Sequence, residues 1–213
     1  MNCDKNDLRL YAVTDRAWLG DKTLVQQVEE SLQGGATMIQ LRERHLDRAA
    51  FKAEALELKE LCRTYAVPLI INDDVELALE IGADGVHVGQ EDLEAGRARA
   101  LLGPDKLLGV SAHSVEEALR AQAAGADYLG AGAVFPTGTK DDVSVLPYER
   151  LKDICAAVDI PVVAIGGIGE HNILQLAGSG VAGVAVVSAI YAQPDVRAAA
   201  RRLKALAEEM VAK

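Results

Sequence analysis

Aromatic side chains are scarce in this sequence: Phe, Trp and Tyr together make up 4% of its 213 residues, whereas 50% of the residues are hydrophobic. A core of this composition has to be filled by aliphatic side chains, which is typical of proteins that combine helices with buried parallel strands. The length suits one domain, and we expect residues 1–213 to form it.

Positive charge is also in deficit, because 22 Lys and Arg face 32 Asp and Glu, for a formal net charge of −10. This balance argues against nucleic acid or an acidic membrane surface as a partner, although a local basic cluster could still bind a small anion. No apolar run reaches the roughly 18 residues of a membrane span. The polar N-terminus differs from a secretory signal, so we expect no membrane association.

Cysteine is rare, and its spacing in the sequence indicates neither a disulfide nor a metal site. Cys3, Cys62 and Cys155 form no CxxC motif, so we expect free thiols and a cytoplasmic protein. The chain also lacks a Walker loop and any Ser-His-Asp or Cys-His arrangement of a covalent catalyst.

Strand-like and helix-like segments alternate along the whole chain. Apolar runs predict eight strands, at residues 9–15, 37–43, 68–74, 85–90, 107–113, 128–135, 161–168 and 183–190. Amphipathic patterns predict eight helices, at residues 23–35, 47–66, 75–83, 92–103, 114–126, 147–159, 171–179 and 195–212. Eight such units predict an α/β fold, a single-domain (β/α)8 TIM barrel. An open doubly wound sheet is the alternative, but its G-x-G-x-x-G fingerprint is missing.

Polar residues gather at the carboxyl ends of the predicted strands, where the active sites of such barrels lie. After strands 7 and 8, Gly166 and Gly167 would let the backbone approach an anion, and Val187 and Ser188 would add N–H donors. A helix beginning near His171 would point its N-terminus at the same place. The sequence therefore predicts a phosphate site there; glycines chosen only for tight packing are the alternative.

A second cluster combines cations with carboxylates. Arg42, Arg44 and Lys140 follow strands that open to the same mouth, and Asp73 and Asp92 follow strands 3 and 4. Mg2+ takes one or two protein carboxylates plus phosphate oxygens, so this set predicts a diphosphate bound with Mg2+. Two alternatives remain open. The charges could form surface ion pairs, and the aspartates could cap helices, Asp73 in a capping box with Glu76.

Seven motifs resemble the thiamine-phosphate synthase family, in order and over the whole chain. They are QLRER (40–44), INDD (71–74), VHVGQED (86–92), GVSAHS (109–114), FPTGTKDD (135–142), AIGGI (164–168) and VVSAI (186–190). The resemblance implies a barrel that joins a hydroxymethylpyrimidine diphosphate to a thiazole phosphate, giving thiamine phosphate and diphosphate. It also implies that diphosphate leaves first and that the thiazole nitrogen attacks the resulting pyrimidine carbocation.

The resemblance further implies roles for individual residues, with small molecules as the partners and Mg2+ as the cofactor. The pyrimidine and its diphosphate would contact Gln40, Leu41, Arg42, Glu43, Arg44, Asn72, Ser111 and Lys140. The thiazole phosphate would contact Thr137, Gly138, Thr139, Gly167, Val187 and Ser188. Asp73 and Asp92 would bind Mg2+, and the catalytic residues would be Arg42, Arg44, Lys140 and Ser111.

Two positions depart from the family pattern. Arg44 stands where the family usually has Lys, which keeps the charge but changes its shape, and Ala133 stands where Pro is frequent. A thiazole tautomerase is a rival on the same fold, but it typically carries a His near Ala133. A non-catalytic phosphate sensor would need neither the Asp pair nor Lys140. A metal-dependent sugar-phosphate epimerase would need several His and Asp metal ligands. Among the histidines, only His87 lies inside a predicted strand with a plausible inward position, and we expect it to be packed and hydrogen-bonded there.

Overall fold

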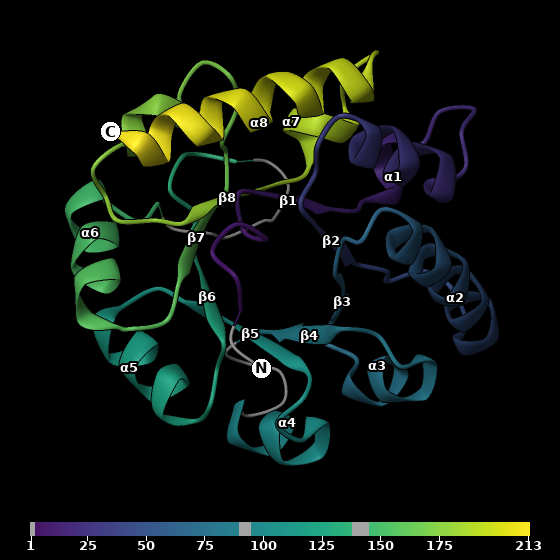
Figure 1. The fold of residues 1–213 in the computed structure, drawn as a ribbon, viewed down its shortest axis with the longest axis horizontal. Helices are drawn as coiled ribbons and strands as arrows, with labels where there is room; N and C mark the ends of the chain where they lie inside the picture. The colour runs from purple at the N-terminus through teal and green to yellow at the C-terminus, as the bar shows by residue number, and fades with distance from the viewer. Residues whose placement is uncertain (1–2, 90–94, 138–144) are drawn as a thin grey trace.

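The computed structural model describes residues 3–89, 95–137 and 145–213. In these residues eight parallel strands form a closed barrel, each paired with the next and β8 with β1 (Figure 1). The strands are β1 (Leu10–Val13), β2 (Met38–Leu41), β3 (Leu69–Asn72), β4 (Gly85–Val88), β5 (Leu107–Ala112), β6 (Tyr128–Gly132), β7 (Val162–Ile165) and β8 (Gly183–Val186). The predicted (β/α)8 barrel is confirmed, and an open sheet is excluded.

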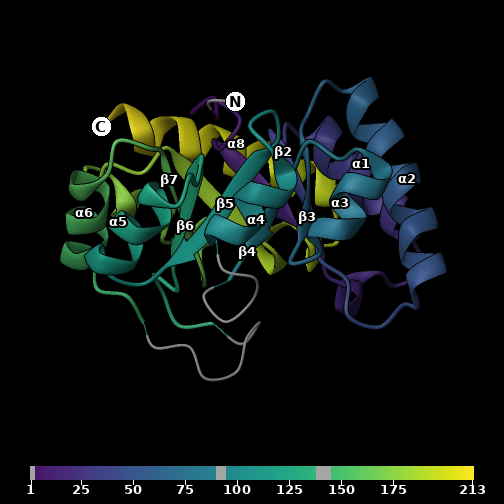
Figure 2. The same cartoon turned by 90° about the horizontal axis from the view of Figure 1, so that it is seen from below.

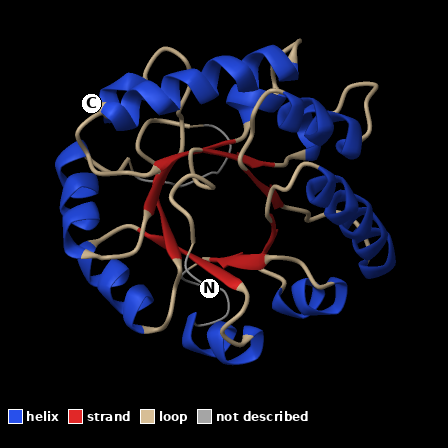
Figure 3. Cartoon of the chain, viewed as in Figure 1, coloured by secondary structure: helices blue, strands red, loops and turns tan. Residues whose placement is uncertain are grey.

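Helices surround the barrel on all sides, as Figure 3 shows looking along the barrel and Figure 2 shows from the side. The α-helices are α1 (Leu24–Gln33), α2 (Arg48–Thr64), α3 (Val75–Ile81), α4 (Ala95–Leu102), α5 (Val115–Ala123), α6 (Tyr148–Ala157), α7 (Ser188–Tyr191) and α8 (Val196–Ala212). Two 3-10 turns, η1 (Arg16–Trp18) and η2 (Ile173–Leu176), join them. None of the helices in the described ranges is both long enough and apolar enough to cross a membrane.

Several helices begin where a side chain accepts from their first free N–H groups. The Thr23 hydroxyl and the Gln26 side chain form a capping box at the start of α1. At α3 the cap is Asp74, whose carboxylate accepts from the Leu77 backbone N–H at 2.7 Å. The alternative that Asp73 caps this helix is therefore wrong, because the capping residue is the next one in the sequence, Asp74.

Two separate hydrophobic cores follow from the alternation of side chains along each strand. On β1, Leu10 and Ala12 face the helices, whereas Tyr11 and Val13 face the barrel interior. The outer core is large and aliphatic, as the composition predicts. The inner core consists of Leu8, Tyr11, Val13, Met38, Ile70, Leu107, Tyr128, Val163, Ala182 and Ala185. These side chains fill the barrel interior below the carboxyl ends of the strands.

The helix predicted at 171–179 was wrong. Only η2 forms there, and the Asn172 side chain explains why, because it accepts from the Gly169 backbone N–H at 2.8 Å and donates to the Gly167 carbonyl at 2.9 Å. An asparagine that bonds its own neighbourhood in this way favours a turn over a helix. The last predicted strand, 183–190, is also shorter: it ends at Val186, and α7 begins at Ser188.

Candidate active site

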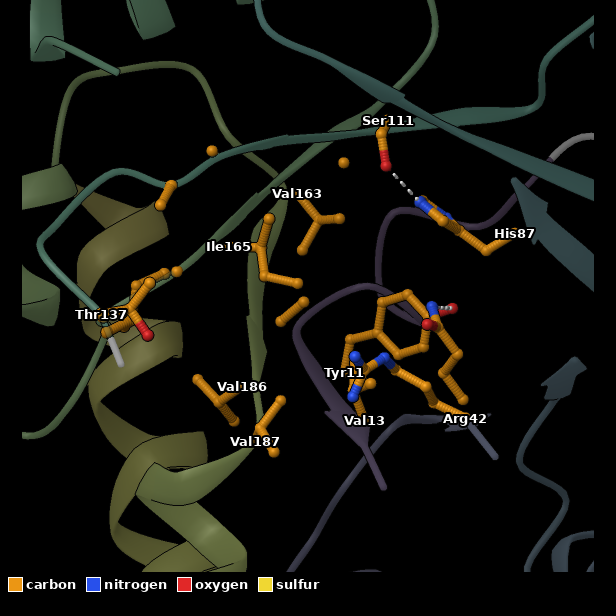
Figure 4. Close-up of a pocket in the computed structure, with 18 of the residues that line it drawn as sticks. Tyr11, Val13, Arg42, His87, Ser111, Thr137, Val163, Ile165, Val186 and Val187 are labelled. Carbon is orange, nitrogen blue, oxygen red and sulfur yellow. Dashed lines mark hydrogen bonds between the residues drawn. The ribbon is translucent and has the colours of Figure 1, made fainter. Parts of the chain in front are cut away.

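A pocket opens at the carboxyl ends of the strands, where Figure 4 shows its lining side chains. Residues from all around the barrel contribute to it, because the carboxyl ends of parallel strands meet at one rim. The predicted site residues that line it are Gln40, Arg42, Asn72, Ser111, Thr137, Gly167, Val187 and Ser188. The structure therefore brings together residues expected at both the pyrimidine diphosphate and the thiazole phosphate.

A chain of hydrogen bonds crosses the floor of this pocket. Gln40 Nε2 donates to the Tyr11 hydroxyl at 2.7 Å, and the Tyr11 and Tyr128 hydroxyls lie 2.9 Å apart. The Tyr128 hydroxyl lies 3.2 Å from His87 Nδ1, and His87 Nε2 lies 3.1 Å from Ser111 Oγ. Figure 4 shows the His87–Ser111 bond. His87 therefore has the hydrogen-bonded role expected from the sequence.

The tyrosine pair is the part of the site that sequence reasoning missed. Both tyrosines are almost completely buried, and burial raises the pKa of Tyr11 and of Tyr128 well above the ordinary value, so both hydroxyls stay protonated. The inward position of Tyr11 could have been predicted from the sequence. Side chains alternate between the two faces of a strand, so Tyr11 lies on the same inward face of β1 as Val13. An inward tyrosine beneath a polar rim has to find a hydrogen-bond partner.

Arg42 is the cation that the described residues place at the pocket. Its Nη1 lies 3.3 Å from Asp15 Oδ2, and its backbone N–H donates to the Thr14 hydroxyl at 3.0 Å. Burial, followed by the charge of Arg44, lowers the pKa of Arg42, while Asp15 and Asp73 oppose that shift. The guanidinium remains protonated at neutral pH. A partly desolvated fixed cation of this kind suits a phosphate ligand.

The neighbours of Arg42 in the QLRER motif occupy different environments. Leu41 is buried in the outer core and is not among the residues that line the pocket. The Glu43 side chain forms an ion pair with Arg16 and accepts from the backbone N–H groups of Arg44 and His45. Arg44 is exposed and lies outside the lining of the pocket. The ligand-binding roles of these three residues stay predictions.

Gly166 and Gly167 adopt backbone conformations with φ of +98° and +67°. A Cβ on Gly166 would lie 2.4 Å from Ala133 Cβ, and one on Gly167 would lie 2.4 Å from the Pro136 carbonyl oxygen. The loop after β6 therefore packs directly on the two glycines, as the packing interpretation requires. Because Gly166 and Gly167 also line the pocket, the phosphate interpretation stays compatible with the same geometry.

Asp73 lies at the mouth, directly after β3, with φ of +63°. Its backbone N–H donates to the His87 carbonyl at 2.8 Å, and its carboxylate accepts from Asn72 Nδ2 at 2.5 Å. The Asp73 side chain is exposed, and an exposed carboxylate oxygen is the type of donor that suits Mg2+. Within the described ranges no three His, Cys, Asp or Glu residues cluster as a complete metal site.

Four predicted site residues lie outside the described residues: Asp92, Gly138, Thr139 and Lys140. Their roles as metal, phosphate and diphosphate contacts stay predictions. The surrounding framework is described, since β4 ends at Val88 and Thr137 lines the pocket. Ala133, the position at which the family often has Pro, is buried beside Gly166.

Fold and site together define the class of protein: a (β/α)8 barrel whose ligand pocket, with an arginine at its rim, lies at the carboxyl end of the strands. A family model described as thiamine monophosphate synthase matches residues 10–190. The chain therefore belongs to the thiamine monophosphate synthase family.

Individual relatives agree with this assignment. Over 199 residues the chain is 49% identical to a thiamine-phosphate synthase of Ruminiclostridium cellulolyticum, covering 93% of this chain and 95% of the relative. Over 197 residues it is 49% identical to one of Methanobrevibacter smithii, covering 92% and 94%. A thiamine phosphate pyrophosphorylase structure from Pyrococcus furiosus superposes with a TM-score of 0.90 at 42% identity, covering 97% of this chain and 98% of that one.

Proposed function

We propose that this protein is a transferase that joins the pyrimidine diphosphate to the thiazole phosphate, forming thiamine phosphate and releasing diphosphate. One observation carries the proposal: residues expected at the two substrates line a single pocket with Arg42 at its rim. The family and the named relatives support the same reaction.

The polar residues of the pocket suit a dissociative reaction. When the bond between the pyrimidine methylene and the diphosphate breaks, the leaving oxygens gain negative charge, which Arg42 can stabilise from a fixed position. Ser111 and Asn72 line the same pocket and can donate hydrogen bonds to the diphosphate, and Lys140 is expected to add a second cation. The thiazole nitrogen then attacks the carbocation, so the chain needs no covalent nucleophile.

The donor set also fits Mg2+. Asp73 offers an exposed carboxylate beside Asn72, and we propose Asp73 and Asp92 as its protein ligands. Bound there, Mg2+ would neutralise part of the diphosphate charge. The Asp73 charge also acts on Arg42, because it opposes part of the lowering of the Arg42 pKa that burial and Arg44 cause.

The thiazole phosphate is proposed to bind at the opposite side of the pocket. The pocket residues proposed to contact it are Thr137, Gly167, Val187 and Ser188. Gly138 and Thr139 follow Thr137 in the sequence and are proposed to contact the same phosphate. The positive φ of Gly167 turns the chain without a side chain, which keeps backbone groups accessible at the surface of the pocket.

The test mixes the protein with both phosphorylated substrates and Mg2+ and measures diphosphate release together with thiamine phosphate. We expect turnover that requires both substrates and that EDTA abolishes. Conversion of a thiazole phosphate tautomer without the pyrimidine would instead indicate the tautomerase. Binding of either ligand without product would indicate a sensor, and both results would contradict the proposed transfer.

A further inference from the structure

The hydrogen-bond chain across the pocket floor has a direction, because its members differ in what they can donate. A hydroxyl has one proton to donate, and a neutral imidazole has one donor and one acceptor nitrogen. Gln40 presents Nε2, which can only donate, to the Tyr11 hydroxyl. Tyr11 would then donate its own proton to the Tyr128 hydroxyl, which lies 2.9 Å away. Tyr128, accepting from Tyr11, would then donate its own proton to His87 Nδ1, which lies 3.2 Å away.

We propose that the Gln40 amide fixes neutral His87 as the Nε2–H tautomer, so that His87 donates to Ser111 and the Ser111 hydroxyl presents its proton to the ligand. Tyr11, Tyr128 and His87 are then positioning residues that act through Ser111. The inference rests on the proposed function for the identity of that ligand, an anionic oxygen of the departing diphosphate. The reversed chain would turn the Ser111 proton toward His87 and present only lone pairs to the anion.

Glycines in the barrel interior leave space for the rings of this hydrogen-bond chain. A Cβ on Gly109 would lie 2.2 Å from Tyr128 Cζ and 2.4 Å from His87 Nδ1, and a Cβ on Gly130 would lie 3.1 Å from His87 Cε1. Two adjacent strands thus omit side chains where the two rings meet. The Tyr11 and Tyr128 rings meet edge to face, with centroids 6.0 Å apart, which brings their hydroxyls together.

The two ends of the chain then show opposite polarity to a ligand. Gln40 lines the pocket and directs one of its two amide N–H groups at Tyr11, and its Oε1 is the group that can accept from a ligand donor. Ser111, at the other end, accepts from His87 Nε2–H in the proposed tautomer and directs its own proton to the ligand. A ligand with an amino group at one end and an anionic oxygen at the other fits this polarity, and an aminopyrimidine diphosphate has both. This hydrogen-bond chain thereby sets the orientation of that substrate.

The test measures the His87 tautomer in ligand-free protein labelled with 15N-histidine, by long-range 1H–15N correlation at a pH where the ring is neutral. The His87 signals are assigned with a His87→Gln variant. We expect wild-type protein to show Nε2–H alone. In Gln40→Glu, the 13C shift of the introduced carboxyl first shows that it is ionised. We then expect the Nδ1–H tautomer of His87, because a carboxylate can only accept, which reverses every hydrogen bond from Tyr11 to His87. Gln175→Glu adds the same charge at an exposed site and should leave Nε2–H unchanged.

A double variant separates the hydrogen-bond chain from a through-space effect of charge. Tyr11→Phe removes one buried hydroxyl and cuts the chain between Gln40 and Tyr128. Combined with Gln40→Glu, it should abolish the switch to Nδ1–H. Nδ1–H in the wild type, an unchanged tautomer in the ionised Gln40→Glu variant, or a switch that persists in the double variant would overturn the inference. Because no substrate is present, failure of the proposed reaction would leave these results unaffected.

Discussion

Arg42 Nη1 lies 3.3 Å from Asp15 Oδ2, so the end of β2 and the end of β1 are joined by an ion pair at the rim of the pocket. The Arg42 side chain is 15% exposed, which makes its charge less screened than that of a surface arginine. Asp15 is itself held, because it also accepts from the Ala17 backbone N–H at 2.9 Å. The pair therefore holds the guanidinium at the rim of the pocket, beside the place proposed for the leaving diphosphate.

Replacing Arg42 tests this placement. We expect Arg42→Met to lower kcat/KM for the pyrimidine diphosphate by at least about a hundredfold, the scale of losing one preorganised electrostatic partner. Arg42→Lys keeps the charge without the two-pronged geometry and should fall in between. Arg63→Met is the control, because Arg63 is exposed and pairs with Glu60 on the surface of α2. Wild-type kinetics in Arg42→Met would remove this residue from the site.

Gly167 supports a prediction about the thiazole side of the pocket. In Gly167→Ala the new methyl group meets the carbonyl oxygens of Pro136 and Phe135, at 2.4 and 2.7 Å, and displaces the loop that continues to Thr137. We expect kcat/KM for the thiazole phosphate to fall roughly a hundredfold, because small displacements of binding groups have effects of that size. Gly103→Ala has a similar φ, +71°, but open space around it. It should lose about 1 kcal/mol of stability with normal kinetics; equal kinetics in both variants would contradict the prediction.

The barrel and most of the pocket could be predicted from the sequence, because both depend on regular features. Apolar runs that end in polar residues place Gln40, Asn72 and Ser111 at one rim once eight βα units close. The Tyr11–Tyr128 bond could not be read in this way. It joins residues 117 positions apart, and its existence depends on which strands face each other across the interior.

Local competition between polar groups explains the errors. Asp73 and Asp74 both stand before α3, and the sequence does not distinguish which of two adjacent aspartates caps it. The answer depends on φ of +63° at Asp73, which follows from its backbone bond to the His87 carbonyl on β4. The helix predicted at 171–179 is likewise absent because the Asn172 side chain forms two local hydrogen bonds, and only η2 forms there.

Glu43 allows a prediction of pH-dependent stability. Burial alone would raise the pKa of Glu43, but backbone N–H donors and Arg16 outweigh burial and hold the pKa below its ordinary value of 4.5. The folded state therefore favours the ionised carboxylate. Its contribution to the free energy of unfolding is fully present above pH 4.5 and is lost as the pH falls through the lowered folded-state pKa.

We expect Glu43→Gln to cost about 1–3 kcal/mol near neutral pH, because it removes charged hydrogen bonds from a side chain that is 2% exposed. The difference from wild type should shrink as the pH falls below 4.5, as measured by urea unfolding at several pH values. Glu60→Gln, in an exposed pair with Arg63, should leave stability nearly unchanged. A difference that is constant with pH would show that the charge of Glu43 contributes nothing.

Asp92 is expected to provide the second carboxylate for Mg2+. We predict that Asp92→Ala weakens turnover at least about a hundredfold, since it removes part of the charge that holds the metal at the leaving group. Raising the Mg2+ concentration should restore part of the loss, as measured by diphosphate release. Asp105→Ala, in the exposed turn before β5 and so at the opposite end of the barrel, is the control. Near-normal rates in Asp92→Ala would remove Asp92 from the metal site.

Asp73 and Asp74 are adjacent, and the structure gives them separable tasks. Asp74 caps α3 and pairs with Arg48, so Asp74→Ala should lower the free energy of unfolding by about 1 kcal/mol and leave turnover unchanged. Asp73→Asn keeps a residue type that tolerates positive φ but removes the charge proposed to hold Mg2+. It should lower turnover at least about a hundredfold with little change in stability. Urea unfolding and diphosphate release, measured on both variants, check the pair: if Asp74→Ala loses the activity instead, the metal ligand is the capping residue, and the left-handed conformation of Asp73 serves only to join β3 to β4.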